Sequence, residues 1–426
     1  MLNTILDLLR ASTADAWEVT DTQETGWEFY LIRHRLDQHR VKLTRHTHVK
    51  VYRRFGEGQF LGSASAEIPP TANAEEAKAA IDALCQRAEY VKNPAYTLVA
   101  PDGEAQAQAG SVDVAAIARD FLEALRAVPE TQTEDLNSYE IFVSEKKRRF
   151  LNSEGVDVTS VYPSSMAEVV VNARRDGHEI ELYRLYHSGA CDRDGLIQAL
   201  TETLRYSRDK LVAQPTPALG RATVLFSTDA ACEIYNYFIS RMSAAMLVRR
   251  VSDWKIGEPV VRDAAGDKVT VRALVTLPNS SDNAAYDPEG ARRWDFDIIR
   301  DGIARQAYGS RQFSQYLGLE RSCVPGNYAV SGGSATAAEL RTGPYLEVVE
   351  FSDFQVDAMS GDIAGEIRLA YWHDGEKTVP VSGGSVTGSM LTLARTLRMS
   401  REQRQYDHLL IPAVTALDGV TIAGVE

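Results

Sequence analysis

Segments in which apolar and polar residues alternate are the feature of this sequence that most constrains its fold. In the second half of the chain, residues 269–277, 346–351, 367–372 and 377–381 show this period of two, with turn-forming residues between them. Such alternation turns one face of a strand toward a core and the other toward water. Because short strands joined by turns pair mostly antiparallel, we expect a strand-rich, largely antiparallel C-terminal domain.

The first half of the chain mixes helical with strand-like patterns. Leu2, Ile5, Leu6 and Leu9 recur at helical spacing, so a helix is predicted at the start. Three further helices, each with a capping residue or a proline near one end, are predicted at residues 73–93, 113–127 and 193–211.

Strand patterns in the first half are separated by short turn sequences. Val41 with Leu43, and Val49 with Val51, supply alternating apolar faces in the second of these strands. Turns containing glycine between the last three predict an antiparallel meander. The predicted strands are residues 27–35, 39–53, 139–144, 166–173 and 179–186.

Pro215 and Pro217 interrupt the chain just after the long helix and mark the main predicted domain boundary. We therefore expect an α+β protein. Residues 1–214 form a mixed α/β N-terminal domain with an internal surface loop near 100–112, and residues 215–426 form the C-terminal β-rich domain.

The charge of the chain argues against direct binding to nucleic acid. The formal net charge is −13 at pH 7, whereas a surface for a polyanion needs clustered lysine and arginine. One basic run, residues 145–150, is predicted to lie on a solvated edge strand, where lysines discourage pairing with another chain.

The four cysteines, Cys85, Cys191, Cys232 and Cys323, form no Cys-x-x-Cys pair, so neither a disulfide framework nor a zinc knuckle is expected. Asp7 interrupts the apolar run at the N-terminus, which is therefore not expected to act as a secretory signal. No apolar run approaches the length that spans a membrane. A cytoplasmic location without membrane contact is the expectation.

Short motifs, in a fixed order, connect the chain to a known family. The motifs are N-S-E-G at 152–155, Y-D-P-E-G at 286–290, I-I-R-D-G at 298–302, G-N at 326–327, S-G-D-I at 360–363, V-T-G at 386–388 and G-V-T-I-A-G at 419–424. Each motif is weak by itself, but their succession resembles the TldD/PmbA family, known by its historical label as modulators of DNA gyrase. The resemblance covers most of the chain.

The resemblance also points to one helix. TldD-type members carry His-Glu-x-x-x-His, in which two imidazoles bind zinc and the glutamate takes a proton from the bound water. PmbA-type members lack this motif. Here the corresponding residues are Cys232, Glu233 and Tyr237, so only the glutamate remains. We expect no metal or cofactor site in this chain, with zinc confined to catalytic relatives.

Other candidate ligands and nucleophiles are incomplete. TldD-like chains supply a late cysteine ligand, and the corresponding place here reads Asp407-His408. His178 and Glu179 are followed by no second histidine four or five residues on. Cys232 would need a base to act as a nucleophile, which only His373 or His408 could supply through the fold.

The resemblance implies a zinc-free, PmbA/TldE-like chain that acts in peptide processing as a partner. It would pair with a TldD-like zinc-bearing subunit, or with itself as a homodimer, and bind a peptide substrate. The alternative is an autonomous divergent peptidase that depends on a metal or on Cys232. A role in gyrase modulation would then be indirect, through proteolysis, because the charge disfavours contact with DNA.

Overall fold

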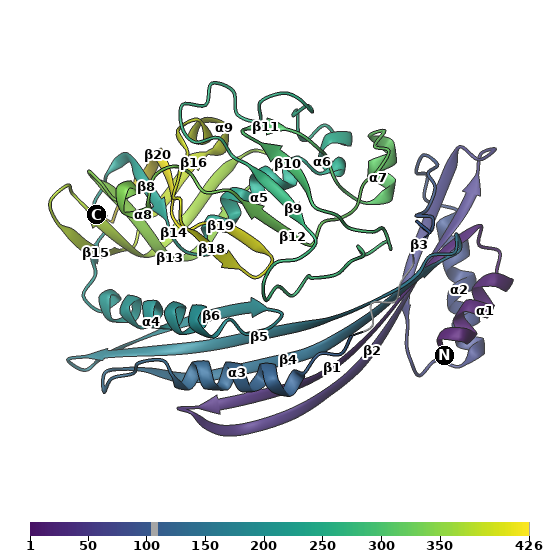
Figure 1. Cartoon of the computed structure of the whole chain (residues 1–426), viewed down its shortest axis with the longest axis horizontal. Helices are drawn as coiled ribbons and strands as arrows, with labels where there is room; N and C mark the ends of the chain where they lie inside the picture. Colours follow the sequence, from purple (N-terminus) through teal and green to yellow (C-terminus); the bar gives the residue numbers. More distant parts are fainter. Residues whose placement is uncertain (104–109, 426) are drawn as a thin grey trace.

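A long, curved antiparallel sheet from the first half of the chain lies below a strand-rich second half (Figure 1). The coordinates are a computed structural model, and they describe residues 1–103 and 110–425. Most of the loop expected near 100–112, namely residues 104–109, lies outside the described residues. None of the helices in the described ranges is both long and apolar enough to cross a membrane.

The N-terminal sheet has six strands in the order β3-β2-β1-β4-β5-β6, and every neighbouring pair is antiparallel. All five predicted strands are present, and β2, β4, β5 and β6 extend past the predicted bounds at both ends because the hydrogen-bonded ladders continue through polar residues. In contrast, β1 begins earlier than predicted but ends before residue 35, and β3 was not predicted. Their bounds are β1 Ala16–Ile32, β2 Arg35–Phe55, β3 Phe60–Ile68, β4 Glu134–Asn152, β5 Asp157–Arg175 and β6 His178–Ser188.

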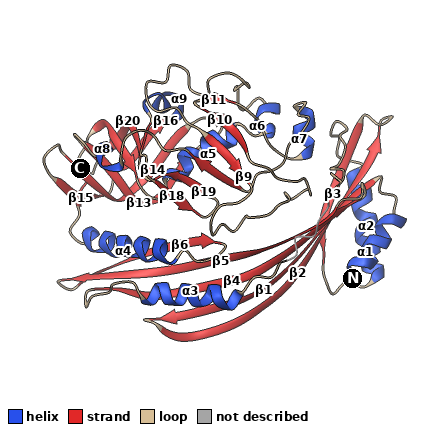
Figure 2. Ribbon diagram, in the orientation of Figure 1, coloured by secondary structure: helices blue, strands red, loops and turns tan. Residues whose placement is uncertain are grey.

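Four helices cover two separate parts of this sheet (Figure 2). At one end, α1 and α2 pack on Val19, Val49 and Val51 and form one core. At the other end, α3 and α4 pack on β4 and β5. All four predicted helices are confirmed, and Asn73 forms a full capping box with Glu76. Their bounds are α1 Leu2–Ala11, α2 Ala74–Ala88, α3 Val114–Arg126 and α4 Arg193–Lys210.

One expectation for this sheet was wrong. The basic run 145–150 does not lie on an edge strand, because β4 pairs with β1 on one side and β5 on the other. Within the run, Arg148 donates hydrogen bonds to the carbonyl oxygens of Tyr286 and Asp287, at 3.0 and 3.1 Å. Charge patterns alone could not reveal this role, since the partners lie in the other half of the chain.

Two apolar side chains of β2, Val41 and Leu43, are exposed to solvent. They are 67% and 78% exposed, whereas Val49 and Val51 are fully buried. Val41 pairs with Trp27, which packs against the α3 and α4 core, so Val41 lies on the same face of the sheet as that core. The apolar face of the sheet therefore continues past its helical cover.

The second half contains two sheets, with strand orders β11-β10-β9-β12-β19-β18 and β13-β8-β20-β16-β14-β15-β7. Most pairs are antiparallel, as expected, and this part is consistent with an α+β fold. The strand bounds are β7 Gln214–Pro215, β8 Gly220–Phe226, β9 Val271–Leu274, β10 Phe296–Arg300, β11 Ile303–Ala304, β12 Asn327–Val330, β13 Tyr345–Val356, β14 Asp362–His373, β15 Thr378–Ser382, β16 Ser385–Ser389, β17 Arg398–Met399, β18 Gln403–Tyr406, β19 Leu409–Pro412 and β20 Thr415–Ala423.

Helix α5, Ala231–Arg241, packs between these sheets and contacts β13 of one and β19 of the other. Tyr235 and Phe238 of α5 are completely buried in the largest core of the molecule. Short helices lie at the surface around it: α6 Ala244–Val248, α7 Arg311–Tyr316, α8 Ala337–Leu340, α9 Met390–Leu393 and the 3-10 turn η1 Ala394–Thr396.

The two halves share buried contacts. Val349 and Leu369 of the second half are buried among residues of α3, α4 and the N-terminal sheet. The chain passes between the halves at β7, which pairs in parallel with β15. We propose that the domain division lies here, near residue 214.

Candidate functional site

Helix α5 carries the three residues that correspond to the zinc-peptidase motif. It begins directly after β8 and a short turn, and its N-cap residue, Ala230, supplies no capping side chain. Cys232 and Glu233 lie in the first turn and are partly buried, whereas Tyr237 in the second turn is only 3% exposed. The sequence thus places all three on one helix, as expected.

Cys232 is a neutral thiol in this environment. Burial raises the pKa of its thiol well above the ordinary value, and the negative charges of Asp229 and Glu233 raise it further. A thiolate is the form that attacks a carbonyl or binds zinc. The two histidines considered as bases lie in hairpin turns: His373 hydrogen-bonds Thr378, and His408 contacts Asp407 at 3.6 Å.

Tyr237 is part of an aromatic cluster. Its ring packs edge-on against Phe238 and Trp254, with centroid separations of 5.4 and 6.0 Å, and the Arg241 guanidinium lies 5.4 Å from its centroid. Burial raises the pKa of the Tyr237 phenol. A ring held in this way, with its proton retained, is not suited to bind a metal.

The residues present therefore do not fit a catalytic zinc ion, which needs three protein donors and an open position. Within residues 1–103 and 110–425, no three His, Cys, Asp or Glu side chains lie close enough together to hold a metal. His178 and Glu179 lie at the exposed start of β6. The site has no donor set through which a hydrolytic step can be derived.

Charged side chains from both halves of the molecule meet near the start of α5. Arg184 of β6 forms a bidentate ion pair with Glu350 of β13. Arg404 of β18 binds Glu202 of α4 at 2.9 Å. Tyr406 of β18 lies under the Arg404 guanidinium. Its phenol is close enough to Cys232 for the two groups to affect each other's ionisation.

Sequence reasoning missed these ion pairs for a physical reason. The partners are separated by 166 and 202 residues, so no local spacing signals them. They fasten the N-terminal sheet and α4 to the strands beside α5. Each of these arginines is matched by a carboxylate, whereas Asp229 and Glu233 at the start of α5 belong to neither pair.

The D-x-E-G segment at 287–290 forms a second contact between the halves. Asp287 accepts hydrogen bonds from the backbone amides of Glu289, Ala291 and Val324, each at 2.9 Å. Glu289 accepts one from the Arg311 amide at 2.6 Å. These contacts give the motif a structural task, because they fix a loop that faces the N-terminal sheet.

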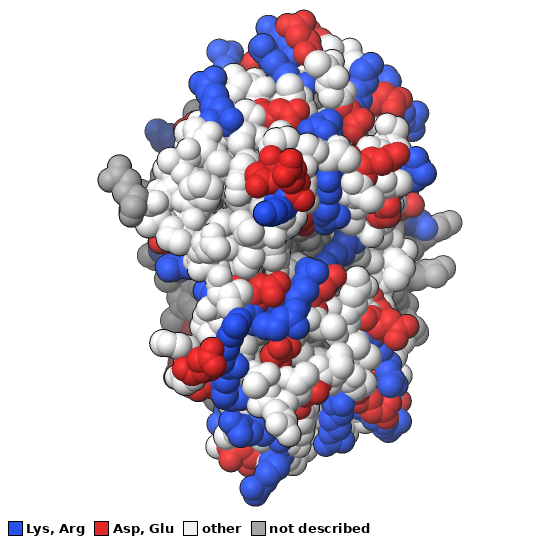
Figure 3. All heavy atoms as spheres, turned by 90° about the vertical axis from the view of Figure 1, so that its left-hand side faces the viewer, with Lys and Arg blue, Asp and Glu red and all other residues white. Residues whose placement is uncertain are grey.

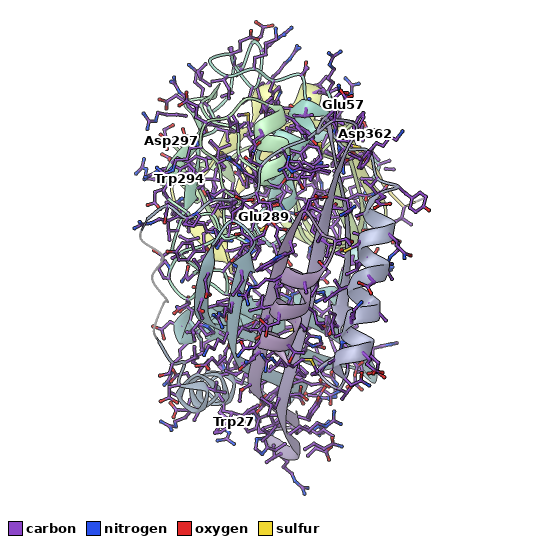
Figure 4. The ribbon with its side chains drawn as sticks, turned by 90° about the vertical axis from the view of Figure 1, so that its right-hand side faces the viewer. Trp27, Glu57, Glu289, Trp294, Asp297 and Asp362 are labelled. Carbon is purple, nitrogen blue, oxygen red and sulfur yellow. The ribbon has the colours of Figure 1, made fainter. Side chains whose placement is uncertain are left out.

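Glu289 lies where the upper half of the molecule meets the sheet (Figure 4). Burial, together with the nearby charges of Asp287 and Glu18, raises the pKa of its carboxyl group to about 7. Glu18 of β1 is itself buried and accepts a 2.7 Å hydrogen bond from the Tyr52 hydroxyl. Carboxylates from both halves thus lie within electrostatic reach of one another.

The second half of the chain matches a known protein family. Residues 219–424, which include α5 and the D-x-E-G segment, match the family of PmbA/TldA metallopeptidase C-terminal domains. The second half of the chain is a C-terminal domain of the TldD/PmbA family. The family resemblance inferred from the motifs is confirmed.

Relatives of this TldD/PmbA chain are distant in sequence but similar in fold. The metalloprotease PmbA of Escherichia coli O157:H7 is 22% identical over 182 residues, which are 42% of this chain and 40% of that protein. The crystal structure of TldE from Thermococcus kodakarensis covers all of both chains with a TM-score of 0.75 at 14% identity. A Thermotoga maritima protein provisionally named as a modulator of a DNA gyrase covers 99% of both chains, with a TM-score of 0.76 at 15% identity.

Proposed function

We propose that this chain is a zinc-free, PmbA/TldE-like member of the TldD/PmbA family that acts as a partner subunit in peptide processing. It would pair with a TldD-like subunit that carries the zinc. The observation that carries the proposal is the chemistry of α5, where a buried neutral thiol and a packed tyrosine occupy the two histidine positions.

The ion pairs beside α5 support a structural role for this region. Arg184 with Glu350 and Arg404 with Glu202 join the two halves of the chain around the start of the helix. Paired groups of this kind are already satisfied, so they are poorly placed to bind the charged ends of a substrate. In a partner subunit, they would hold the domains in a fixed relation.

An uncovered apolar strip on the N-terminal sheet supports pairing with another chain. Val41 and Leu43 are exposed and continue the face formed by Trp27 and Phe29. Figure 4 labels Trp27 on the part of the sheet farthest from the second half of the chain. Exposed apolar surface of this kind is typical of protein interfaces. A TldD-like subunit, or a second copy of this chain, would cover it.

The surface charge supports a protein or peptide partner in preference to nucleic acid. The net charge is −13, and on the face shown in Figure 3 acidic side chains are interspersed among the basic ones. A role in gyrase modulation, the label of some relatives, would therefore act through peptide processing. We also propose a cytoplasmic location, because the four cysteines are free and a reducing compartment keeps thiols in that state.

The decisive experiment combines metal analysis with co-purification. Tagged protein isolated from its native host is expected to bring down a homologue with His-Glu-x-x-x-His in a one-to-one ratio, with the zinc in that homologue. The isolated chain is expected to hold well under one zinc per chain and to leave unstructured peptides intact. One tightly bound zinc per isolated chain, with peptide cleavage that a chelator abolishes, would support an autonomous metallopeptidase instead. Cleavage that survives chelator and disappears in Cys232→Ser would support the thiol alternative.

A further inference from the structure

A small cavity lies beside the second half of α5, where Tyr237 lines it, whereas Cys232 and Glu233 in the first turn do not. Its volume is about 170 Å³, which is room for roughly five water molecules or one large side chain. Tyr237, Trp254, Val260 and Met390 of α9 contribute apolar surface to its lining. Charged side chains also line it, namely Asp253, Lys255, Glu258, Arg262 and Arg395. The lining therefore combines apolar and charged side chains from three separate segments.

A buried arginine lies beside the rings of Tyr237 and Trp254. Arg241 is 4% exposed, and its guanidinium lies 5.4 and 5.2 Å from the ring centroids of Tyr237 and Trp254. It donates hydrogen bonds to the carbonyl oxygens of Ala358 and Met359, and its Nε has no partner. Among the described residues, its carboxylate partner is Asp253, whose side chain is 79% exposed. Solvent therefore screens the attraction between this carboxylate and the buried guanidinium.

Large apolar residues surround the mouth of the cavity. Leu391 lines it and is 58% exposed, while Ile256 and Met359 in adjoining segments are 54% and 61% exposed. Met359 belongs to the turn at 357–361, whose Gly361 lies against both Leu391 and Tyr237. That turn, which carries part of the S-G-D-I motif, therefore packs against two lining residues without lining the cavity itself.

The charges that line the cavity do not balance. Asp253 is paired with Arg241, and Lys255 with Glu258 at 3.7 Å. Arg262 and Arg395 also line the cavity, and within the described part of the chain no hydrogen bond or ion pair engages either guanidinium. Two exposed arginines in the lining thus remain without a carboxylate partner among the described residues, and a planar guanidinium favours a carboxylate.

We infer that this cavity binds the carboxyl-terminal residue of a peptide that ends in a large apolar side chain. The side chain would lie against Tyr237 and Trp254, and the free α-carboxylate would lie between Arg262 and Arg395. The volume admits one such side chain, and the two guanidiniums in the lining are available to bind a carboxylate. The inference goes beyond the partner-subunit proposal, because the isolated chain contains every residue that it uses.

The test is calorimetric titration of the isolated protein with N-acetyl-Ala-Ala-Phe and with the same peptide as its C-terminal amide. The free acid is expected to bind, and amidation is expected to weaken binding by about tenfold or more, since it removes a charge-assisted contact. The double variant Arg262→Gln/Arg395→Gln should weaken binding of the acid by a similar factor and leave binding of the amide unchanged. Arg221→Gln, an exposed arginine on β8 that does not line the cavity, is the matched control.

A second arm tests the apolar part of the lining. N-acetyl-Ala-Ala-Gly should bind at least tenfold more weakly than the phenylalanine peptide, since its last residue has no side chain to bury. Equal binding of acid and amide, or no loss in the double arginine variant, would overturn the inference. A dimer that the same two arginine substitutions dissociate would also overturn it, because the occupant would then be a second copy. Failure to co-purify a zinc-bearing homologue would leave this measurement unaffected.

Discussion

Gly290 lies directly against the ring of Phe150, so closely that a Cβ atom at position 290 would approach Phe150 Cδ1 to 2.6 Å. Phe150 belongs to β4 of the N-terminal sheet, and Gly290 ends the D-x-E-G motif of the second half. Two earlier residues of the motif hold the same loop by hydrogen bonds: Asp287 accepts one from the Glu289 amide, and Glu289 accepts one from the Arg311 amide. The two halves of the molecule therefore interlock at a glycine.

Replacing Gly290 with alanine is expected to destabilise the protein by about 2–4 kcal/mol. Its φ of +79° strains any L-residue, and the new methyl group would also meet Phe150 and Val156. The measurement is urea unfolding. Gly318→Ala is the matched control, because Gly318 has a φ of +77° but open space around it. Equal losses of unfolding free energy in the two variants would mean that Phe150 moves aside without destabilising the protein.

Glu289 is expected to make stability depend on pH. Its pKa is about 7 in the folded protein, against 4.5 ordinarily, mainly because of burial. Between these values the folded state binds more protons than the unfolded state, so stability falls as pH rises from about 4.5 to 7. The full loss is about 3 kcal/mol.

The variant Glu289→Gln isolates this contribution. It should flatten the fall in unfolding free energy between pH 4.5 and 7, because glutamine keeps the acceptor oxygen for the Arg311 amide without the charge. Glu376→Gln, at an exposed position in a hairpin, should leave the slope as in the parent. A slope that is unchanged in Glu289→Gln would assign the pH dependence to other groups.

The ion pair between Arg184 and Glu350 is expected to be costly to break and nearly neutral to replace. Their side chains are 20% and 15% exposed, so Glu350→Ala would leave a largely buried guanidinium without a partner, at a cost of about 3–5 kcal/mol. The double variant Arg184→Met/Glu350→Leu should recover most of that loss. Chemical denaturation of the parent and the two variants checks this, and a double variant no more stable than Glu350→Ala would contradict it.

The sequence predicted elements better than it predicted their partners. Capping at Asn73 and the stripe of Leu2, Ile5, Leu6 and Leu9 are local signals, and both were confirmed. The central place of residues 145–150 in the sheet was missed because it depends on β1, more than a hundred residues earlier in the chain. The same limit applies to the site: the motif located α5, but the packing of Tyr237 on Trp254 arises from tertiary contacts.

Cys232 is expected to react slowly with thiol reagents. The residue is partly buried and the pKa of its thiol is raised, mainly by loss of solvation, so little thiolate exists at pH 8. Native protein and Cys232→Ser should release the same amount of chromophore from Ellman's reagent in the first minutes, whereas in denaturant the parent should release four equivalents and the variant three. Rapid native labelling that disappears in Cys232→Ser would point to an activated nucleophile.

The exposed apolar strip on β2 is expected to mediate self-association of the isolated chain. Val41 and Leu43 are 67% and 78% exposed on the face that carries Trp27, and exposed apolar surface of this kind is favourable to bury. Light scattering after size exclusion should show a dimer at micromolar concentration, and Val41→Glu/Leu43→Glu should shift it to a monomer with the same unfolding midpoint. The control is Tyr90→Glu, which places the same charge at a tyrosine that is 87% exposed just after α2 and should leave the dimer intact. A parent protein that remains monomeric, or a dimer that persists in the β2 variant, would show that this strip is not the contact surface.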